Sequence, residues 1–169
     1  LDAEDREYEG DFICAAEKAT PEIINFIITH GKGLLCTPVL PETAERLELP
    51  PMTSARPDSY RTAYTITVDY HSVRTGVTAS ERCKTIQELV NPKSTAADFV
   101  RPGHILPLVA KAGGVLRRAG HTEAAVDLAR LAGLQPAGVL CEILDETGER
   151  ASRCRLLEMA QIFNLKIIT

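Results

Sequence analysis

Short apolar strands and amphipathic helices alternate along this chain, and their order limits the folds that it can adopt. The strongest strand signal lies at residues 62–68, where the residues alternate and are largely β-branched. A helix start is clear at Thr20-Pro21, because threonine is a good N-cap and proline suits the first helical position. Since strands and helices mix without strict β-α-β alternation, the sequence predicts one α+β domain, with a mixed β-sheet flanked by helices.

The other elements follow from apolar periodicity, glycine and proline. Strands are expected at residues 12–16, 33–39, 62–68, 104–109, 137–144 and 165–168. Helices are expected from Thr20 to Gly31, over residues 41–47 and 80–90, from Thr122 to Gly133, and over residues 155–163. Loops are expected at residues 2–11, 50–61 and 91–103.

The composition is that of a globular protein. A length of 169 residues suits one domain, and 44% hydrophobic residues can bury a real core. A net charge of −4 offers no basic excess to displace counterions from nucleic acid. The sequence shows no signal peptide and no apolar run that could span a membrane, so we expect a cytoplasmic protein with neither nucleic acid nor membrane as a partner. Because the chain begins at Leu1 and stops on an apolar rise, both ends look trimmed.

The five cysteines are odd in number and widely scattered. No Cys-x-x-Cys pair occurs, which argues against a zinc site built from thiolates. Most lie in apolar runs and are interpreted as small buried side chains in a reducing compartment. Cys36 is the exception to watch, because the Gly31-Lys32-Gly33 turn comes just before it.

The stretch from Arg117 to Ala124 combines two arginines, a glycine, a histidine, a hydroxyl and a carboxylate at the start of a helix. A helix start presents backbone N–H groups and the positive end of the helix dipole, which favour a bound anion. Thr122 is expected to cap this helix, and Arg118 and Thr122 could complete a phosphate cradle. The alternative is an ordinary capped helix with a surface histidine.

Six carboxylates lie within residues 2–11, with Arg6 among them. Such a segment is either a solvated charged loop or a site for a divalent cation. Carboxylates with one imidazole suit magnesium or manganese better than zinc or copper. Arg6 is then either a salt-bridge partner or a clamp on the substrate.

Two further residues stand out. Glu142 interrupts the otherwise apolar strand at residues 137–144, so it faces either water at a sheet edge or a site that uses a raised pKa for proton transfer. His104 begins an apolar strand beside a glycine and is either a core histidine or a catalyst. His30, at a helix end, and His71, in a polar turn, are expected to be structural and solvated, respectively.

Taken in order, the motifs of this chain resemble those of the 3,4-dihydroxy-2-butanone 4-phosphate synthases of riboflavin biosynthesis. The similarity covers nearly the whole chain, which is interpreted as one synthase-like domain over residues 1–169. Tyr8 and Arg74 depart from the family pattern, but neither departure removes a candidate metal ligand. The matching motifs are DREYEGD at 5–11, HGKG at 30–33, TAYT at 62–65, RTGVT at 74–78, RPGH at 101–104, GGVL at 113–116, RAGHTEA at 118–124 and PAGVLCE at 136–142.

The resemblance implies metal-dependent conversion of D-ribulose 5-phosphate to 3,4-dihydroxy-2-butanone 4-phosphate and formate, with Mg²⁺ or Mn²⁺ as cofactor. It implies Glu7 and His121 as metal ligands, and His104 and Glu142 as residues essential for proton transfer. It also implies a homodimer with active sites near the subunit interface, and related chains are fused to a GTP cyclohydrolase II domain. The implied substrate-binding residues are Arg6, Glu7, Asp11, Thr75, Arg118, Ala119, Gly120, His121, Thr122 and Glu142.

Two other functions stay open at this point. A metal-dependent sugar-phosphate isomerase shares enediol formation with the synthase, and only the release of formate separates them. A weakly active paralogue that survives as a binding or scaffolding domain is the other possibility. The intact set of Glu7, His104, His121 and Glu142 argues against that paralogue.

Overall fold

The computed structural model describes residues 1–2, 8–53 and 62–169. Arg6 and Glu7, which are predicted to bind substrate and metal, lie outside the described residues. Within the described residues, no helix is long and apolar enough to cross a membrane.

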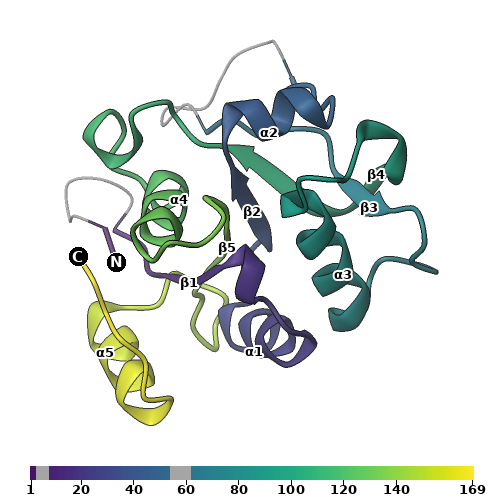
Figure 1. Ribbon diagram of the computed structural model, residues 1–169. Helices are drawn as coiled ribbons and strands as arrows, with labels where there is room; N and C mark the ends of the chain where they lie inside the picture. Colours follow the sequence, from purple (N-terminus) through teal and green to yellow (C-terminus); the bar gives the residue numbers. More distant parts are fainter. Residues whose placement is uncertain (3–7, 54–61) are drawn as a thin grey trace.

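A five-stranded mixed β-sheet forms the centre of the molecule (Figure 1). Its strands lie in the order β1-β5-β2-β4-β3, and β2 pairs in parallel with β4 while the other neighbours are antiparallel. The prediction of one α+β domain on a mixed sheet is therefore confirmed. The strands are β1 (Asp11–Ala15), β2 (Cys36–Val39), β3 (Val68–Tyr70), β4 (Phe99–Val109) and β5 (Gly138–Glu142).

Local sequence signals fix where the helices begin. The Thr20 side chain accepts a hydrogen bond from the Ile23 N–H at the start of α1, and Thr78 and Glu81 form a capping box at the start of α3. The α-helices are α1 (Pro21–Gly31), α2 (Pro41–Arg46), α3 (Ala79–Val90), α4 (His121–Leu131) and α5 (Arg153–Ile162), and the short 3₁₀ helices are η1 (Ala16–Lys18), η2 (Ala96–Asp98) and η3 (Gly114–Leu116).

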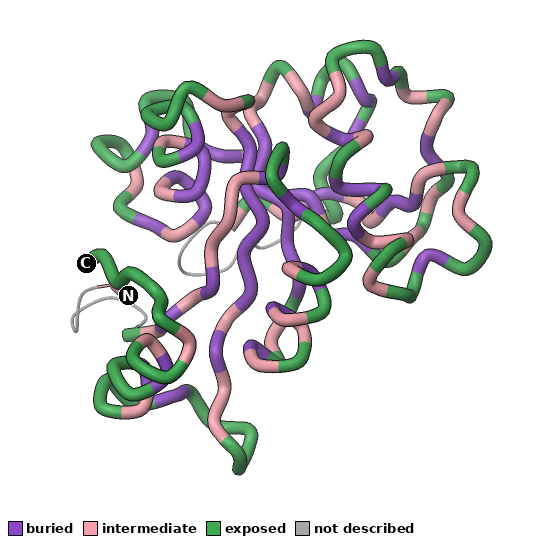
Figure 2. The backbone as a smooth tube through the Cα atoms, turned by 60° about the horizontal axis from the view of Figure 1, so that its bottom comes forward, coloured by how far each residue is buried: buried purple, intermediate pink, exposed green. Residues whose placement is uncertain are grey.

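The main core involves α1, α3 and the sheet. The two helices pack against each other, and α1 also contacts β1 and β5 while α3 contacts β3 and β4. Figure 2 shows the buried stretches along the central strands and the exposed C-terminal tail. The larger core cluster includes Phe12, Ile24, Ile27, Val39, Ile86, Leu89, Ile105 and Val139.

The other face of the sheet carries a smaller cluster around Cys36. Cys36 of β2 pairs with Leu106 of β4 on one side and with Leu140 of β5 on the other. Residues directly opposite each other in neighbouring strands share a face, and so do residues two apart along a strand. Glu142 therefore lies on the face of Leu140, and His104 on the face of Leu106. Both predicted proton-transfer residues thus lie on one face, toward the same end of the sheet.

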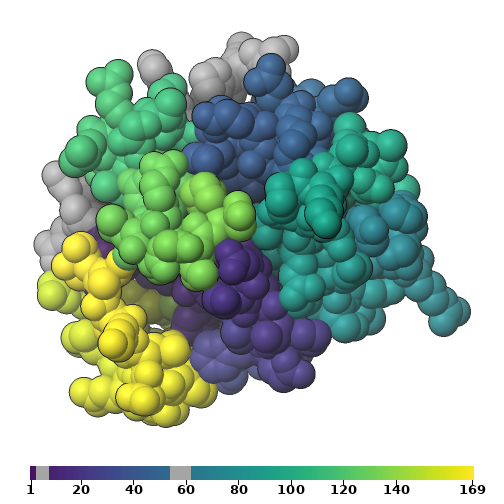
Figure 3. All heavy atoms as spheres, in the orientation of Figure 1, coloured from purple at the N-terminus to yellow at the C-terminus, as the bar shows by residue number. Residues whose placement is uncertain are grey.

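The C-terminal segment lies against the N-terminal part of the chain. The Phe163 ring contacts the rings of Phe26 and His30, with centroid distances of 5.0 and 4.6 Å. The N-terminal amino group of Leu1 donates to the carbonyl of Ile168 at 3.2 Å. Figure 3 shows the yellow C-terminal residues beside the purple N-terminal ones. His30 thus has a structural role, as expected.

The strand predicted at residues 62–68 is largely wrong. In this segment Tyr64 and Thr65 make only isolated bridges, to Leu108 and Pro51, and β3 begins at Val68. The segment does run along β4, because the Thr65 N–H donates to the carbonyl of Pro107 at 3.1 Å. Pro107 has no N–H to return, so a regular ladder cannot form here.

Several other boundaries also differ from the prediction, and the loop expected at residues 91–103 contains η2 and the first residues of β4. β4 begins at Phe99 rather than at residue 104, because Val100 and Phe99 pair with β3. Gly103 permits this pairing, since a Cβ there would lie 2.0 Å from the carbonyl carbon of Val68. The strand expected at residues 33–39 is confined to β2, and residues 165–168 form no strand.

Candidate active site

A pocket of about 140 Å³ opens beside the start of α4. Its lining combines carboxylates, an imidazole and a guanidinium with several apolar side chains. Of the residues predicted to bind substrate, Asp11, Arg118, His121, Thr122 and Glu142 line it, and Glu9, Cys36, Thr62, Tyr64, Leu108 and Leu140 complete its walls.

Two carboxylates face each other across the strands. Asp11 of β1 and Glu142 of β5 are direct partners in the antiparallel ladder. Directly opposed residues have Cβ atoms roughly 5 Å apart, and like charges in this position destabilise a sheet. Since β5 lies between β1 and β2, Glu142 is not at a sheet edge. The arrangement is therefore costly to the fold and well suited to bind a cation.

The loop before β2 forms a cradle for Glu142. The Leu34 N–H donates to Oε2 of Glu142 at 2.7 Å, and the Gly33 N–H donates to its backbone carbonyl at 3.2 Å. A Cβ on Gly33 would lie 2.4 Å from Oε2, so only glycine allows this close approach. Glu142 is thus half-buried with one carboxylate oxygen fixed by the backbone.

His121 is the first residue of α4, and its ring lies beside Asp11. The distance from Nδ1 of His121 to Oδ1 of Asp11 is 3.3 Å, and the two side chains are 11% and 3% exposed, respectively. Such a carboxylate fixes the ring orientation and, when Nδ1 carries the proton, leaves Nε2 as the electron-pair donor.

The expected cap of α4 is wrong. The N-cap is Gly120 in an extended conformation, without a capping side chain, and Thr122 is the buried second residue of the helix. Thr122 therefore belongs to the pocket wall rather than to the helix cap. Ala119 is exposed and Gly120 buried, and these two residues connect Arg118 to the helix start.

Among the described residues, two side chains hold Arg118 in the pocket. Its Nη1 donates to Oε2 of Glu123 at 2.7 Å, and its Nη2 donates to Oγ1 of Thr62 at 3.3 Å. Neither Glu123 nor Thr62 was predicted from the sequence to act at the site. The signal for Glu123 was present, because a carboxylate stands one helical turn before Val126 on the buried face of α4.

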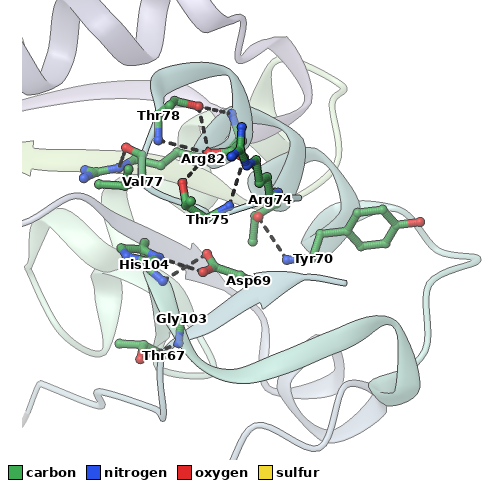
Figure 4. Close-up of polar contacts among 12 residues, drawn as sticks. Thr67, Asp69, Tyr70, Arg74, Thr75, Val77, Thr78, Arg82, Gly103 and His104 are labelled. Atoms are coloured by element: carbon green, nitrogen blue, oxygen red, sulfur yellow. Dashed lines mark hydrogen bonds and ion pairs between the residues drawn. The ribbon is translucent and has the colours of Figure 1, made fainter. Parts of the chain in front are cut away.

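His104 lies outside the pocket wall, at a corner formed by β3, β4 and the turn before α3. Its Nδ1 lies 2.7 Å from Oδ2 of Asp69, and its backbone N–H donates to Oδ1 at 3.0 Å (Figure 4). Asp69 is buried, whereas 43% of the His104 side chain is exposed. The imidazole is thus oriented by a carboxylate and open to solvent, an arrangement common in general acid–base catalysis.

Thr75 lies in the same corner and not in the pocket. Its N–H and its hydroxyl both donate to the Glu81 carboxylate, each at 3.1 Å. The N–H groups of Thr75 and Arg74 lower the pKa of Glu81 from 4.5 to about 2. The turn packs closely on Asp69, since a Cβ on Gly76 would lie 2.1 Å from Oδ2 of that residue.

The cysteines behave largely as expected. Cys36, Cys83 and Cys141 are buried, Cys14 is half-buried and Cys154 is exposed. Burial, followed by the nearby Glu142, raises the pKa of the Cys36 thiol and raises that of Cys141 to about 12. Cys36 therefore lines the pocket as a neutral thiol.

Comparison with known proteins relates the chain to a known family. A family described as 3,4-dihydroxy-2-butanone 4-phosphate synthase matches residues 1–169.

The chain belongs to this family.

This synthase-family chain spans less than half the length of the curated relatives that it matches. It is 61% identical over 168 residues to the riboflavin biosynthesis protein RibBA of Bacillus mycoides (strain KBAB4), covering 99% of this chain and 42% of that protein. Among solved structures, it resembles RibBX, a two-domain 3,4-dihydroxy-2-butanone 4-phosphate synthase from A. baumannii, with 47% identity and a TM-score of 0.94 over 99% of this chain and 49% of that one.

A second solved structure shows metal in the family. It is a 3,4-dihydroxy-2-butanone 4-phosphate synthase in complex with two magnesium ions, with 40% identity and a TM-score of 0.92 over 100% of this chain and 84% of that one. In residues 1–2, 8–53 and 62–169 of the present chain, no three His, Cys, Asp or Glu groups are clustered to hold a metal ion. The donor types in the pocket, carboxylates with one imidazole, nevertheless fit magnesium or manganese.

Proposed function

We propose that this chain catalyses the metal-dependent conversion of D-ribulose 5-phosphate to 3,4-dihydroxy-2-butanone 4-phosphate and formate, an early cytoplasmic step of riboflavin biosynthesis. The observation that carries the proposal is the pocket beside α4. In this chain of the synthase family, four polar side chains from β1, β5 and the start of α4 line that pocket: Asp11, Glu142, Arg118 and His121.

The phosphate of the substrate would bind at the start of α4. Arg118 provides a fixed cation, and Thr122 provides a hydroxyl from the same pocket wall. Ala119 and Gly120 bring the backbone to the helix start, where the dipole favours an anion. Thr75 is a further candidate for binding the phosphate, and it would have to act from the corner around His104.

The metal would be held by His121 and by Glu7, which lies outside the described residues. Asp11 would orient the His121 ring through the contact at 3.3 Å. When bound, Mg²⁺ or Mn²⁺ would stabilise negative charge on vicinal oxygens of the substrate as a Lewis acid. Asp11 and Arg6 are proposed to contact the substrate.

Glu142 and His104 would move the protons. The reaction requires removal of a proton beside a carbonyl, loss of water and rearrangement of the carbon skeleton. Glu142 is suited to one transfer because the Leu34 N–H fixes one oxygen of a carboxylate in the pocket wall. His104 is suited to another because Asp69 orients its exposed ring.

We further propose a homodimer with its active sites near the subunit interface. On the pocket face of the sheet, half-buried Ile13, Tyr64 and Leu106 surround the buried cluster of Cys36. The neighbouring Leu34 is 57% exposed. A second copy would cover this apolar surface. Because the chain spans about 42% of its RibBA relatives, we also propose that it can function as one domain of a longer protein, fused to a GTP cyclohydrolase II domain.

The direct test is a turnover assay on D-ribulose 5-phosphate with Mg²⁺, in which formate is quantified with and without EDTA. Formate should be released with Mg²⁺ and should disappear with EDTA. Conversion of the substrate without formate would instead support a sugar-phosphate isomerase. No conversion by folded, magnesium-loaded protein would support a paralogue that serves only in binding.

A further inference from the structure

Glu123 is a buried carboxylate in the wall behind the pocket. Only 1% of the residue is exposed. A carboxylate is stable at such a position only when its oxygens are paired. Oε1 accepts from the Lys111 N–H at 2.8 Å, and Oε2 accepts from Nη1 of Arg118 at 2.7 Å. Glu123 thus joins the loop that precedes α4 to a side chain of the pocket.

Arg118 is ordered by this contact. Its side chain is 17% exposed while it lines the pocket. Because the guanidinium is planar, a fixed carboxylate at one edge, together with Thr62 Oγ1 at Nη2, sets the orientation of the whole group. The conformational entropy of a long side chain is then lost during folding and not when the ligand binds.

We propose that Glu123 is a positioning residue, which holds Arg118 in the orientation that receives the phosphate of the substrate. This inference rests on the proposed function, in which Arg118 binds that phosphate. Glu123 itself makes no contact with the substrate and acts through Arg118.

Asp127 offers a matched control on the same helix. It lies one turn after Glu123, and its Oδ2 accepts from the Val115 N–H at 2.9 Å. Its cationic neighbour is Arg130, at 3.7 Å. Both carboxylates therefore fasten the segment before α4 to the helix, but Glu123 is paired with the pocket arginine and Asp127 with an outer one.

The first measurement compares Glu123→Gln with Asp127→Asn in the turnover assay. The glutamine can still accept from the Lys111 N–H but loses the charge that holds Arg118. We expect the KM for D-ribulose 5-phosphate to rise about tenfold or more in Glu123→Gln with kcat within about threefold, as for lost ground-state binding. Asp127→Asn should keep the KM of the wild type. An unchanged KM in Glu123→Gln would overturn the proposal.

A double-substitution cycle separates positioning from a purely structural role. If Glu123 acts through Arg118, the KM of Arg118→Ala/Glu123→Gln should equal that of Arg118→Ala. A KM of the double variant that is raised by the product of the two single-variant factors would contradict the proposal. Should Glu123→Gln fail to fold, Glu123→Asp keeps the charge but moves it away from Arg118, and it should raise the KM by a smaller factor; an unchanged KM there would count against the role.

Binding of inorganic phosphate, measured by calorimetry, separates this inference from the proposed function. Wild type and Asp127→Asn should bind phosphate alike, and Glu123→Gln about tenfold more weakly. That pattern in a protein that releases no formate would support the positioning role while rejecting the proposed reaction. Formate release with equal phosphate affinity in all three proteins would reject the positioning role alone.

Discussion

The pocket beside α4 and the corner around His104 hold their charged groups in opposite ways. In the corner, Asp69 accepts from the His104 backbone and holds its ring, and Glu81 accepts from the turn before α3. In the pocket, Asp11 and Glu142 oppose each other as like charges, with the His121 ring beside Asp11 and the Leu34 N–H donating to Glu142. The corner is thus a complete hydrogen-bonded scaffold that presents one exposed imidazole, whereas the pocket places two carboxylates where a bound cation would stabilise them.

The largest expected effect is on the rate of formate release, and it should appear in one variant from each region. Glu142→Gln in the pocket and His104→Asn in the corner should each lower the rate of formate release by roughly 10³-fold, because general acid–base groups contribute about 10²–10⁴-fold. The thermal midpoint of each variant should stay close to that of the wild type. His71→Asn is a control that should leave turnover unchanged, because the His71 ring is exposed and, within the described part of the chain, contacts the Asp98 carbonyl and the Tyr70 ring. A near-normal rate of formate release by His104→Asn would show that the corner has only a structural role.

The next largest expected effect is on the stabilisation of the fold by Mg²⁺, and it should be confined to the pocket. Mg²⁺ should raise the free energy of unfolding by about 1.4 kcal/mol at tenfold excess over its Kd, by mass action. Asp11→Asn removes one of the two opposed charges, so its metal-free form should be at least as stable as the wild type, and its response to Mg²⁺ should be weaker. Thr75→Val, in the corner, should keep the full response. The measurement is thermal unfolding of the wild type and the two variants over a series of Mg²⁺ concentrations. Equal stabilisation of all three proteins would show that Mg²⁺ binding does not distinguish the pocket from the corner.

The smallest effect should be confined to the corner and should depend on pH. The folded state lowers the pKa of Glu81 from 4.5 to about 2, so the carboxylate stabilises the fold above pH 4.5 and this contribution is lost as the pH falls toward 2. Glu81→Gln should therefore unfold with a shallower dependence on pH across that interval, with turnover at neutral pH little changed. Thermal midpoints from pH 2 to 6 measure this, and parallel curves for the two proteins would contradict it.

The sequence predicted the fold well where local signals were complete. Thr20 and Pro21 marked the start of α1, and the apolar residues around Glu142 marked β5. It failed at residues 62–68, because a β-branched pattern carries no information about the missing N–H of Pro107 in the neighbouring strand. It also failed at Thr122, because Gly120 can cap α4 without a side chain.

Part of the candidate site was predicted from the sequence, because local motifs mark some of its residues. Motifs singled out Asp11, Arg118, His121 and Glu142, and the fold brings these four to one pocket. Partners that act across the fold, such as Asp69 for His104 and Thr62 for Arg118, depend on contacts that sequence spacing does not reveal. Glu7 stays a prediction, because it lies outside the described residues.

The central claim is that the pocket and the corner serve one reaction. It is tested most directly by the rate of formate release from the double variant His104→Asn/Glu142→Gln beside its two single variants. Groups that act as a unit give strongly non-additive losses. We therefore predict that the double variant is about as slow as the slower single variant. A loss equal to the product of the two single losses, with both variants folded, would show that the two regions act independently and would contradict this account.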